Sequence, residues 1–225
     1  MQRTVQQIYK RETTMRKPDA FIKILETERL ILREVVESDD EFMLDLLNQP
    51  SFIKYIGDRN VRDLEQSREF IESRYRKSYA ENGFGLYLVE LKDEFRTLAD
   101  APVSAFDDET PADKSVSESE IQNPKSVIQN QSIGICGFVK RDDLPDADIG
   151  FAFLPQFEKK GFAFESAKAV MKFGREKLNL RRVLAITTQN NESSIKLLEK
   201  LGFKFERLVK MPHDADELNL FSSEN

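Results

Sequence analysis

The chain has 225 residues, of which 33% are charged and 40% are hydrophobic, and its formal net charge is −6. The mean hydropathy is −0.52, and no apolar run approaches the roughly 18 residues that a membrane-spanning helix needs, so the sequence argues against a membrane protein. One cysteine and one histidine cannot build a disulfide framework, a Cys-rich zinc site or a His-cluster metal site, so we expect no bound metal. The acidic balance argues against direct nucleic-acid binding, which needs a basic surface.

The negative charge is concentrated in one internal segment. Residues 93–132 contain nine acidic and three basic residues, a net charge of −6, with three prolines and no glycine. Such a segment cannot bury enough apolar surface to offset the entropy of ordering it. We therefore expect an acidic disordered insertion between two strands, where a long loop costs little closure entropy. Residues 1–20 carry a net charge of +3 and predict a flexible N-terminal extension, with a transit peptide as the alternative.

The first half of the remaining sequence predicts a strand, two helices and another strand. Apolar alternation within residues 21–34 indicates the first strand. Ser38 and the acidic residues after it are typical of a helix N-terminus, and a second helix is predicted from Asp63 or Ser67 to Ala80. The Asn-Gly pair that follows ends this helix, and the apolar run at 84–91 indicates the next strand.

The second half alternates strands and helices and predicts a single domain over residues 21–222. It contains one strand-helix-strand unit of the kind that joins parallel strands. The fold class is therefore mixed α/β, with one parallel crossover in its middle. The predicted strands are 133–139, 148–154, 182–188, 203–210 and 217–222, and the predicted helices are 162–178 and 193–201.

The turn before the long helix has features of an anion-binding site. Phe157–Glu165 reads F-E-K-K-G-F-A-F-E and follows a predicted strand. A helix N-terminus presents free backbone N–H groups and the positive end of the helix dipole. Gly161 would let a ligand approach the backbone, and Lys159 and Lys160 would add positive charge for a phosphate. Taken alone, the segment fits an ordinary turn with two solvated lysines better.

A second segment changes this interpretation. Asn191–Phe203 reads N-E-S-S-I-K-L-L-E-K-L-G-F and follows the next predicted strand at once. The pair of segments resembles the GNAT acetyltransferase superfamily. Phe157–Glu165 is similar to its acetyl-CoA pyrophosphate loop, usually Q/R-x-x-G-x-G/A, and the second segment is similar to its N-x-x-S signature, which ends in K-x-G-F.

Further motifs resemble the branch of this superfamily that acetylates the N-termini of ribosomal proteins. They occur in the order typical of that branch, and the resemblance spans about residues 24–210 apart from the insertion. The motifs are T-E-R-L-x-L-R at Thr27–Arg33, I-G-x-x-G at Ile133–Gly137, x-I-G-F with its I-G-F at Ile149–Phe151, and G-F-A-x-E at Gly161–Glu165.

The resemblance implies the GNAT fold, a mostly antiparallel sheet that is splayed at the cofactor site and flanked by about four helices. Acetyl-CoA, as co-substrate, would lie between the strands at 149–154 and 182–188. The implied cofactor contacts are Phe153 and Leu154 for the pantetheine amides; Lys159, Lys160, Gly161, Phe162 and Ala163 for the pyrophosphate; Asn191 for the pantetheine arm; and Lys196 or Lys200 for the adenosine end.

The resemblance also implies an N-acetyltransferase in which a neutral amine attacks the acetyl thioester directly in a ternary complex. A backbone N–H near Phe153 would stabilise the oxyanion. Ser194, directly or through water, is the remaining proton donor, because the tyrosine of other members is replaced here by Leu197-Leu198. Asp148 stands where the branch often carries a glutamate, and is a candidate base acting through water or electrostatically. The alternative, which we weigh equally, is that Asp148 is a carboxylate at the edge of a strand with no catalytic role.

The acceptor would bind against the first two helices, with Phe52, Tyr55 and Ile56 lining the wall. A protein N-terminus, a polyamine and a small metabolite all stay open as the amine. Glu158 and Lys159 replace the Trp and Gly of the branch's W-G-K-G loop. An acid would repel the pyrophosphate, and a side chain at 159 would crowd it if that position needs positive φ. The alternative function is therefore a weak or inactive CoA-binding or protein-interaction module. We expect a cytoplasmic monomer or homodimer.

Overall fold

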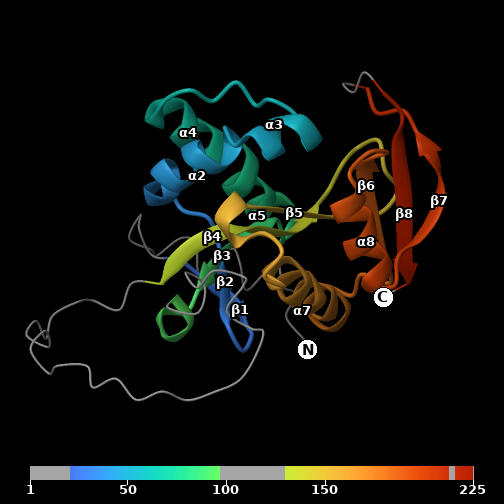
Figure 1. The fold of residues 1–225 in the computed structure, drawn as a ribbon. Helices are drawn as coiled ribbons and strands as arrows, with labels where there is room; N and C mark the ends of the chain where they lie inside the picture. Colours follow the sequence, from blue (N-terminus) through green and yellow to red (C-terminus); the bar gives the residue numbers. More distant parts are fainter. Residues whose placement is uncertain (1–20, 97–129, 213–215, 225) are drawn as a thin grey trace, which may run out of the picture.

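In a computed structural model, the chain forms one eight-stranded sheet with helices on both faces (Figure 1). The structure describes residues 21–96, 130–212 and 216–224. The sheet has the order β1-β2-β3-β4-β5-β6-β8-β7, and every neighbouring pair is antiparallel except β5 and β6. This arrangement confirms the expected mixed, mostly antiparallel sheet with one parallel crossover. The strands are β1 (Lys23–Glu26), β2 (Leu30–Arg33), β3 (Leu86–Leu91), β4 (Gln131–Val139), β5 (Asp148–Phe153), β6 (Arg182–Thr188), β7 (Lys204–Val209) and β8 (Leu218–Glu224).

The first predicted strand is in fact two strands joined by a tight turn. β1 and β2 pair antiparallel, and the turn between them is closed by Thr27. Its backbone N–H donates to the carbonyl of Leu30 at 2.9 Å, and its hydroxyl accepts from the N–H of Leu30 at 3.0 Å. The turn was not predicted because a threonine hydroxyl closes it, with no glycine or proline to signal it.

The helices between β2 and β3 cover one face of the sheet (Figure 1). They confirm the two predicted helices and add a short third one, α3, which begins with a proline at its first turn. Asp63 caps α4 by accepting from the N–H of Gln66 at 2.8 Å. α4, η2 and α5 follow each other without a break, and the middle piece, η2, is a π-helix. The elements are η1 (Glu37–Asp39), α2 (Asp40–Leu47), α3 (Pro50–Tyr55), α4 (Leu64–Phe70), η2 (Ile71–Arg76) and α5 (Lys77–Asn82).

The other face is covered by α7 (Phe162–Lys177), which follows the short η5 (Pro155–Phe157). Its small residues Ala167, Val170 and Gly174 are buried against the sheet. Cys136 of β4 is fully buried in the same core, and burial raises the pKa of its thiol to about 12. α8 (Glu192–Lys200) packs against β6.

Most of the predicted insertion at 93–132 lies outside the described residues, as do residues 1–20. Its described ends differ from the expectation of disorder. Asp93–Phe95 form a short 3-10 helix, η3, whose Phe95 packs against the core, and β4 already begins at Gln131, which pairs with Leu91. No helix within the described ranges is long and apolar enough to cross a membrane.

The two glycines of the I-G-x-x-G motif lie where β4 approaches its neighbours closely. A Cβ on Gly137 would lie 2.1 Å from the carbonyl oxygen of Gly85, which precedes β3. A Cβ on Gly134 would lie 2.5 Å from the carbonyl oxygen of Ala152 and 2.5 Å from the ring of Phe153, both on β5. The motif is therefore explained by backbone packing on both sides of β4.

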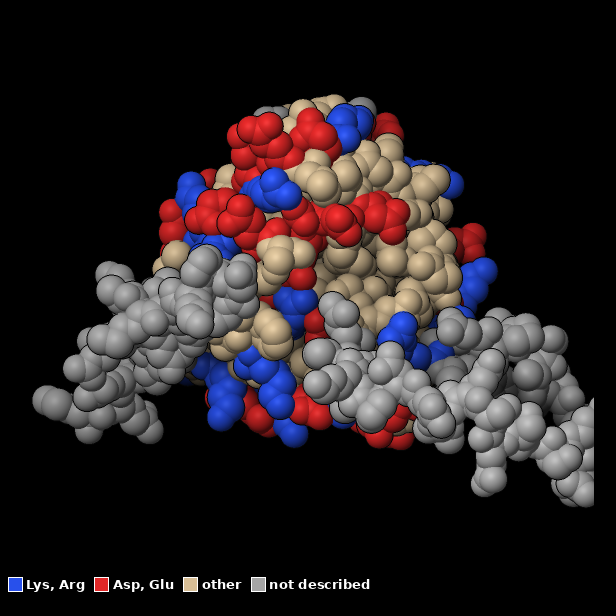
Figure 2. Space-filling view, turned by 90° about the vertical axis from the view of Figure 1, so that its left-hand side faces the viewer, with Lys and Arg blue, Asp and Glu red and all other residues tan. Residues whose placement is uncertain are grey.

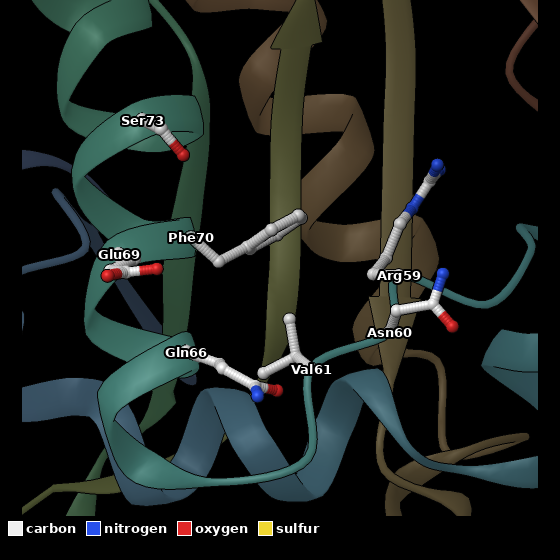
Figure 3. Close-up of a pocket in the computed structure, with 7 residues that line it drawn as sticks. All are labelled: Arg59, Asn60, Val61, Gln66, Glu69, Phe70 and Ser73. Carbon is white, nitrogen blue, oxygen red and sulfur yellow. The ribbon is translucent and has the colours of Figure 1, made fainter.

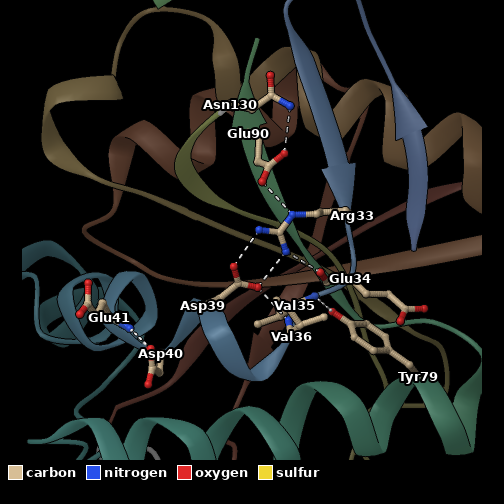
Figure 4. Close-up of polar contacts among 10 residues, drawn as sticks. All are labelled: Arg33, Glu34, Val35, Val36, Asp39, Asp40, Glu41, Tyr79, Glu90 and Asn130. Carbon is tan, nitrogen blue, oxygen red and sulfur yellow. Dashed lines mark hydrogen bonds and ion pairs between the residues drawn. The ribbon is translucent and has the colours of Figure 1, made fainter. Parts of the chain in front are cut away.

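A buried ionic network joins β2 and β3 to η1 (Figure 4). The guanidinium of Arg33 donates to Asp39 through Nη1 at 2.8 Å and Nη2 at 2.7 Å, and to Glu90 through Nε at 2.7 Å. Arg33, Asp39 and Glu90 are all less than 9% exposed. Asp39 also accepts from the N–H of Val36 at 2.8 Å. One cation thus satisfies two carboxylates that water does not reach.

The neighbouring Glu34 lacks such a partner. Its Oε1 is buried without a hydrogen bond within the described structure, and burial raises the pKa of the carboxyl to about 7 despite the nearby Arg76. Because the folded pKa lies above that of the unfolded chain, the stabilising contribution of the protonated form is complete below about pH 4.5 and is lost as the pH rises through about 7.

We therefore expect Glu34→Gln to be more stable than the parent at pH 8 by about 1 kcal/mol, a value discounted because the side chain is partly exposed. At pH 4.5 the two proteins should be equally stable. Urea unfolding across this pH range measures the difference. Glu37→Gln removes an exposed carboxylate nearby and should leave the pH dependence unchanged. If the free energy of unfolding changed with pH in the same way for the parent and Glu34→Gln, the expectation would be wrong.

Candidate active site

The only parallel junction among the described strands is also the least complete. β5 and β6 share a single register pair, Asp148 with Leu184, and the N–H of Leu184 donates to the carbonyl of Ala147 at 2.9 Å. Beyond this pair the two strands separate toward their C-terminal ends. This is the expected splay of the sheet, and it leaves one edge of β5 without a neighbouring strand.

The register of β4 with β5 shows which backbone groups face the opening. The N–H of Leu154 donates to the carbonyl of Ile133 at 3.0 Å. Because backbone groups alternate in direction along a strand, those of Phe151 and Phe153 point away from β4, toward β6. This direction suits the role expected for Phe153. The carbonyl of Leu154 accepts from Phe157 at 2.9 Å. Both backbone groups of Leu154 thus have partners within the chain, and the expected pantetheine contact of Leu154 stays a prediction. The backbone groups of Phe151, which were not predicted as a contact, face the opening.

The segment predicted as a pyrophosphate loop lies between η5 and α7. Gly161 is the N-cap of α7 with φ 84°, and it has no side chain to bind the first amides of the helix, such as those of Phe162 and Ala163. Lys159 also has a positive φ, 60°, a conformation that costs a residue with a Cβ about 1–2 kcal/mol. The departure from glycine is thus accommodated by backbone strain. The side chains of Lys159 and Glu158 are both exposed.

The N-x-x-S motif begins α8. The side-chain oxygen of Asn191 accepts from the N–H of Ser194 at 3.1 Å, so this asparagine is a helix N-cap. Its side-chain NH2 group is the part that can donate to a ligand. Lys196 pairs with Glu192 at 3.2 Å on an exposed surface, whereas the ammonium of Lys200 lies 4.2 Å from the ring centroid of Phe164 on α7. Of the two lysines considered for the adenosine end, Lys200 contacts α7.

Asp148 lies at the closed end of the opening and is 1% exposed. Burial raises the pKa of its carboxyl to about 6, although Arg141 donates to it through Nε at 2.9 Å. By strand alternation its side chain is on the face opposite that of Phe151 and Phe153. A buried, ion-paired carboxylate fits the electrostatic role better than that of a base that takes a proton directly.

Comparisons with known proteins agree with this geometry. The family model described as the acetyltransferase (GNAT) domain matches residues 29–204, which is most of the chain. The chain belongs to the GNAT acetyltransferase family. The matched region begins at the turn between β1 and β2 and ends at the start of β7, so it includes both the opening and the N-terminus of α7.

Relatives cover nearly the same length. An uncharacterized N-acetyltransferase of Bacillus subtilis, YoaA, is 26% identical over 83% of this chain and 86% of its own. A solved structure of RimL, a ribosomal L7/L12 alpha-N-protein acetyltransferase in complex with coenzyme A, superposes with TM-score 0.64 at 16% identity, covering 90% of this chain and 98% of its own. Spermidine N-acetyltransferase from Vibrio cholerae, in complex with CoA and spermine, has TM-score 0.60 at 16% identity, covering 88% and 96%. These structures share the GNAT fold.

A surface pocket of about 240 Å³ opens on the side of the domain covered by the helices between β2 and β3 (Figure 3). It lies between the α3–α4 loop and the helix formed by α4 and η2. Gln66, Phe70 and Ser73 recur at helical spacing, a pattern from which the sequence could have indicated this wall. The pocket is lined by Arg59, Asn60, Val61, Gln66, Glu69, Phe70 and Ser73.

None of the three predicted acceptor residues lines this pocket. Phe52 is buried in the main core with 6% exposure, so its expected place on an open wall is corrected. Ile56 is exposed, and Tyr55 is partly buried with the ammonium of Lys54 4.8 Å from its ring centroid. The pocket is formed by the α3–α4 loop and the helix that follows it, one loop further along the chain than the predicted wall.

The helices around this pocket are acidic. Residues 37–72 contain ten acidic and four basic residues, again a net charge of −6. Figure 2 shows Asp and Glu side chains gathered over the upper part of one face, at the height of α2 and α4 in Figure 1. The whole-chain charge conceals this local excess, because basic residues elsewhere balance it. The acidic members are Glu37, Asp39, Asp40, Glu41, Asp45, Asp58, Asp63, Glu65, Glu69 and Glu72.

Proposed function

We propose that this GNAT domain transfers the acetyl group of acetyl-CoA to a primary amine by direct attack in a ternary complex. The observation that carries the proposal is the opening between β5 and β6, into which the backbone of Phe151 and Phe153 points. The opening lies beside the N-terminus of α7. RimL in complex with coenzyme A shares this fold.

The described residues fit the chemistry of acetyl-CoA. The pantetheine amides need strand-like hydrogen bonds, which the backbone of Phe151 and Phe153 can supply. The pyrophosphate needs positive charge and N–H donors, which Lys159, Lys160 and the first amides of α7 can supply. Asn191 can donate to the pantetheine arm from the N-terminus of α8. Acetyl-CoA brings the activated acetyl thioester, and the chain provides its binding and orientation.

Three groups of the chain act on the reacting atoms in this proposal. The N–H of Phe153 stabilises the negative charge that develops on the carbonyl oxygen. Ser194, one turn into α8, supplies a proton to the leaving thiolate, directly or through water. Asp148 stabilises positive charge at the closed end of the opening or accepts a proton through water.

The acceptor enters from the helical side. A primary amine is a cation at neutral pH, and the acidic excess of residues 37–72 favours its approach. Glu69 provides a carboxylate in the pocket. Tyr55 and Ile56, at the end of α3, provide a less polar surface for the acceptor. A protein N-terminus and a small-molecule amine both meet this description. The Vibrio cholerae neighbour acts on spermidine, a cationic amine of the second kind.

The alternative function is a CoA-binding or protein-interaction module with little turnover. It is favoured by one feature of the loop: Lys159 adopts positive φ where the branch carries glycine. The acidic Glu158 next to it would weaken pyrophosphate binding further. A CoA-binding module shares its ligand with the enzyme, so these two functions differ in turnover and not in the ligand.

Calorimetry with acetyl-CoA followed by a thiol-release assay over a panel of amines tests the proposal. We expect binding, thiol release with at least one amine, and a kcat about 100-fold lower in Ser194→Ala with little change in acetyl-CoA affinity. Ser193→Ala is the matched control, because Ser193 is an exposed neighbour in the same turn. Absence of heat and of a thermal shift at millimolar acetyl-CoA would refute the cofactor assignment. Binding without thiol release would favour the module, and an unaltered rate in Ser194→Ala would remove this serine from the mechanism.

A further inference from the structure

The turn between β1 and β2 is bonded to the first turn of α7, 136 residues away in sequence. The carboxylate of Glu165 accepts all the hydrogen bonds between this turn and α7. Its Oε1 accepts from the hydroxyl of Thr27 and from the backbone N–H of Arg29 at 3.1 Å, and its Oε2 accepts from Nε of Arg29 at 2.7 Å. The second guanidinium nitrogen, Nη2, is also 2.7 Å from Oε2, so the ion pair is bidentate from the arginine side. Both side chains are partly buried.

The same guanidinium also contacts the loop that precedes α7. Its Nη1 donates to the carbonyl of Lys160 at 3.2 Å. Its central carbon lies 4.5 Å from the ring centroid of Phe162, and its Nη2 would lie 3.4 Å from a Cβ on Gly161. Arg29 therefore contacts Lys160 and Phe162 on either side of Gly161, from the sheet edge.

These contacts have two consequences for an anion at the N-terminus of α7. Partial burial alone would raise the pKa of Glu165, but hydrogen bonds from Thr27 and Arg29 hold it below its usual range, so the carboxylate stays charged. An unpaired negative charge in this first turn would repel a pyrophosphate, and Arg29 neutralises it. The hydrogen bond from Arg29 to the Lys160 carbonyl ties the loop before α7 to the turn between β1 and β2. The first N–H groups of α7 have no acceptor within the helix, so they can donate to an anion.

We propose that Arg29 is a positioning residue for acetyl-CoA, and that it shapes and neutralises the pyrophosphate loop without touching the reacting atoms. The inference rests on the proposed function. It also explains why the T-E-R-L and G-F-A-x-E motifs occur together in this sequence: Thr27 and Arg29 of the first hold Glu165 of the second. Preorganised binding groups lower the cost of ordering the site when a ligand arrives.

A comparison of two acetyl donors tests this role. Acetyl-CoA carries the pyrophosphate, and acetyl-pantetheine lacks it. For Arg29→Met we expect the KM for acetyl-CoA to rise about tenfold, with kcat within twofold of the parent and kcat/KM for acetyl-pantetheine unchanged. Calorimetry with CoA should show the same tenfold loss. The double variant Arg29→Met/Glu165→Gln should recover part of it, because the unpaired carboxylate is gone.

Lys92→Met is the matched control. Lys92 donates to the carbonyl of Thr27 at 2.8 Å and so holds the same turn without contacting the loop. Its KM for acetyl-CoA should stay at the parent value. The KM of Arg29→Lys for acetyl-CoA should lie between those of the parent and Arg29→Met, because lysine keeps the charge and loses the planar fork. If Arg29→Met does not fold, Arg29→Lys takes its place in the test.

The outcomes separate this inference from the proposed function. An unchanged KM for acetyl-CoA in Arg29→Met would overturn the inference, and so would an equal loss with both donors, since that would show a purely structural role. A parent protein that neither binds CoA nor uses either donor would refute the proposed function, and the inference with it.

Discussion

Replacing Arg33 with methionine is expected to lower the free energy of unfolding by about 3–5 kcal/mol. Arg33 is the partner that Asp39 and Glu90 share, and all three side chains are buried. Removing the cation leaves two carboxylates away from water and close to each other, which costs far more than the ion pairs themselves contribute. Urea unfolding at pH 7 measures the loss, with an unchanged denaturant slope if both proteins unfold in two states.

Arg62→Met provides the matched control. Arg62 pairs with Asp58, but both side chains are exposed, at 51% and 38%, so its removal should cost far less stability than the removal of Arg33. The combination of Arg33→Met with Asp39→Asn and Glu90→Gln should be less unstable than Arg33→Met alone, because no uncompensated charge stays buried. If Arg33→Met and Arg62→Met lost the same stability, the burial argument would be wrong.

A large loss of turnover is also expected from Gly134→Ala. The added Cβ would lie 2.5 Å from both the carbonyl oxygen of Ala152 and the ring of Phe153, so β5 must move away from β4. That movement displaces the Phe153 N–H, which we propose as the oxyanion donor. A misplacement on the order of 1 Å costs about 100-fold in rate, and we expect kcat for the preferred amine to fall by about this factor.

Gly150→Ala is the control on the same strand pair. Its Cβ would meet only flexible side-chain atoms, Leu86 at 3.2 Å and Val139 at 3.7 Å. Turnover in this variant should stay within about threefold of the parent, since a flexible neighbour can yield. Circular dichroism and thermal unfolding establish that Gly134→Ala is folded at the assay temperature. A folded Gly134→Ala with parental kcat would remove the Phe153 N–H from the mechanism.

The sequence predicted most elements because their signals are local. Strand periodicity located β3 to β8 within two residues at most ends, and the capping residue Asp63 was among the predicted start points of its helix. The split between β1 and β2 was missed because a threonine hydroxyl closes the turn. α3 was missed because six residues carry too little periodicity to distinguish a helix from a loop.

The site was predicted less completely, for reasons that lie beyond local sequence. The backbone of Phe151 was missed as a group facing the opening because strand parity was not considered: neighbouring residues direct their backbone groups to opposite sides. Parity depends on the register with β4, which one sequence does not encode legibly. The contact between Arg29 and Glu165 joins distant motifs, and the sequence showed only that both motifs were present. The acidic excess of residues 37–72 is a property of the sequence, and it was missed because the charge was summed over the two outlying segments and not along the rest of the chain.

The π-helix in the middle of the helix from Leu64 to Asn82 has a geometric consequence. The buried residues of the whole helix recur every four positions: Ser67, Ile71, Tyr75 and Tyr79. In an α-helix a spacing of four advances the side chain by about 40° per step, so this row would wind off the core within three steps. The wider π turn between Ile71 and Arg76 rotates less per residue and counters that winding. One side of the helix thus stays anchored to the core, and the pocket residues lie outside this buried row. In the proposed function, a change at these residues would alter the amine that is selected without disturbing the anchor.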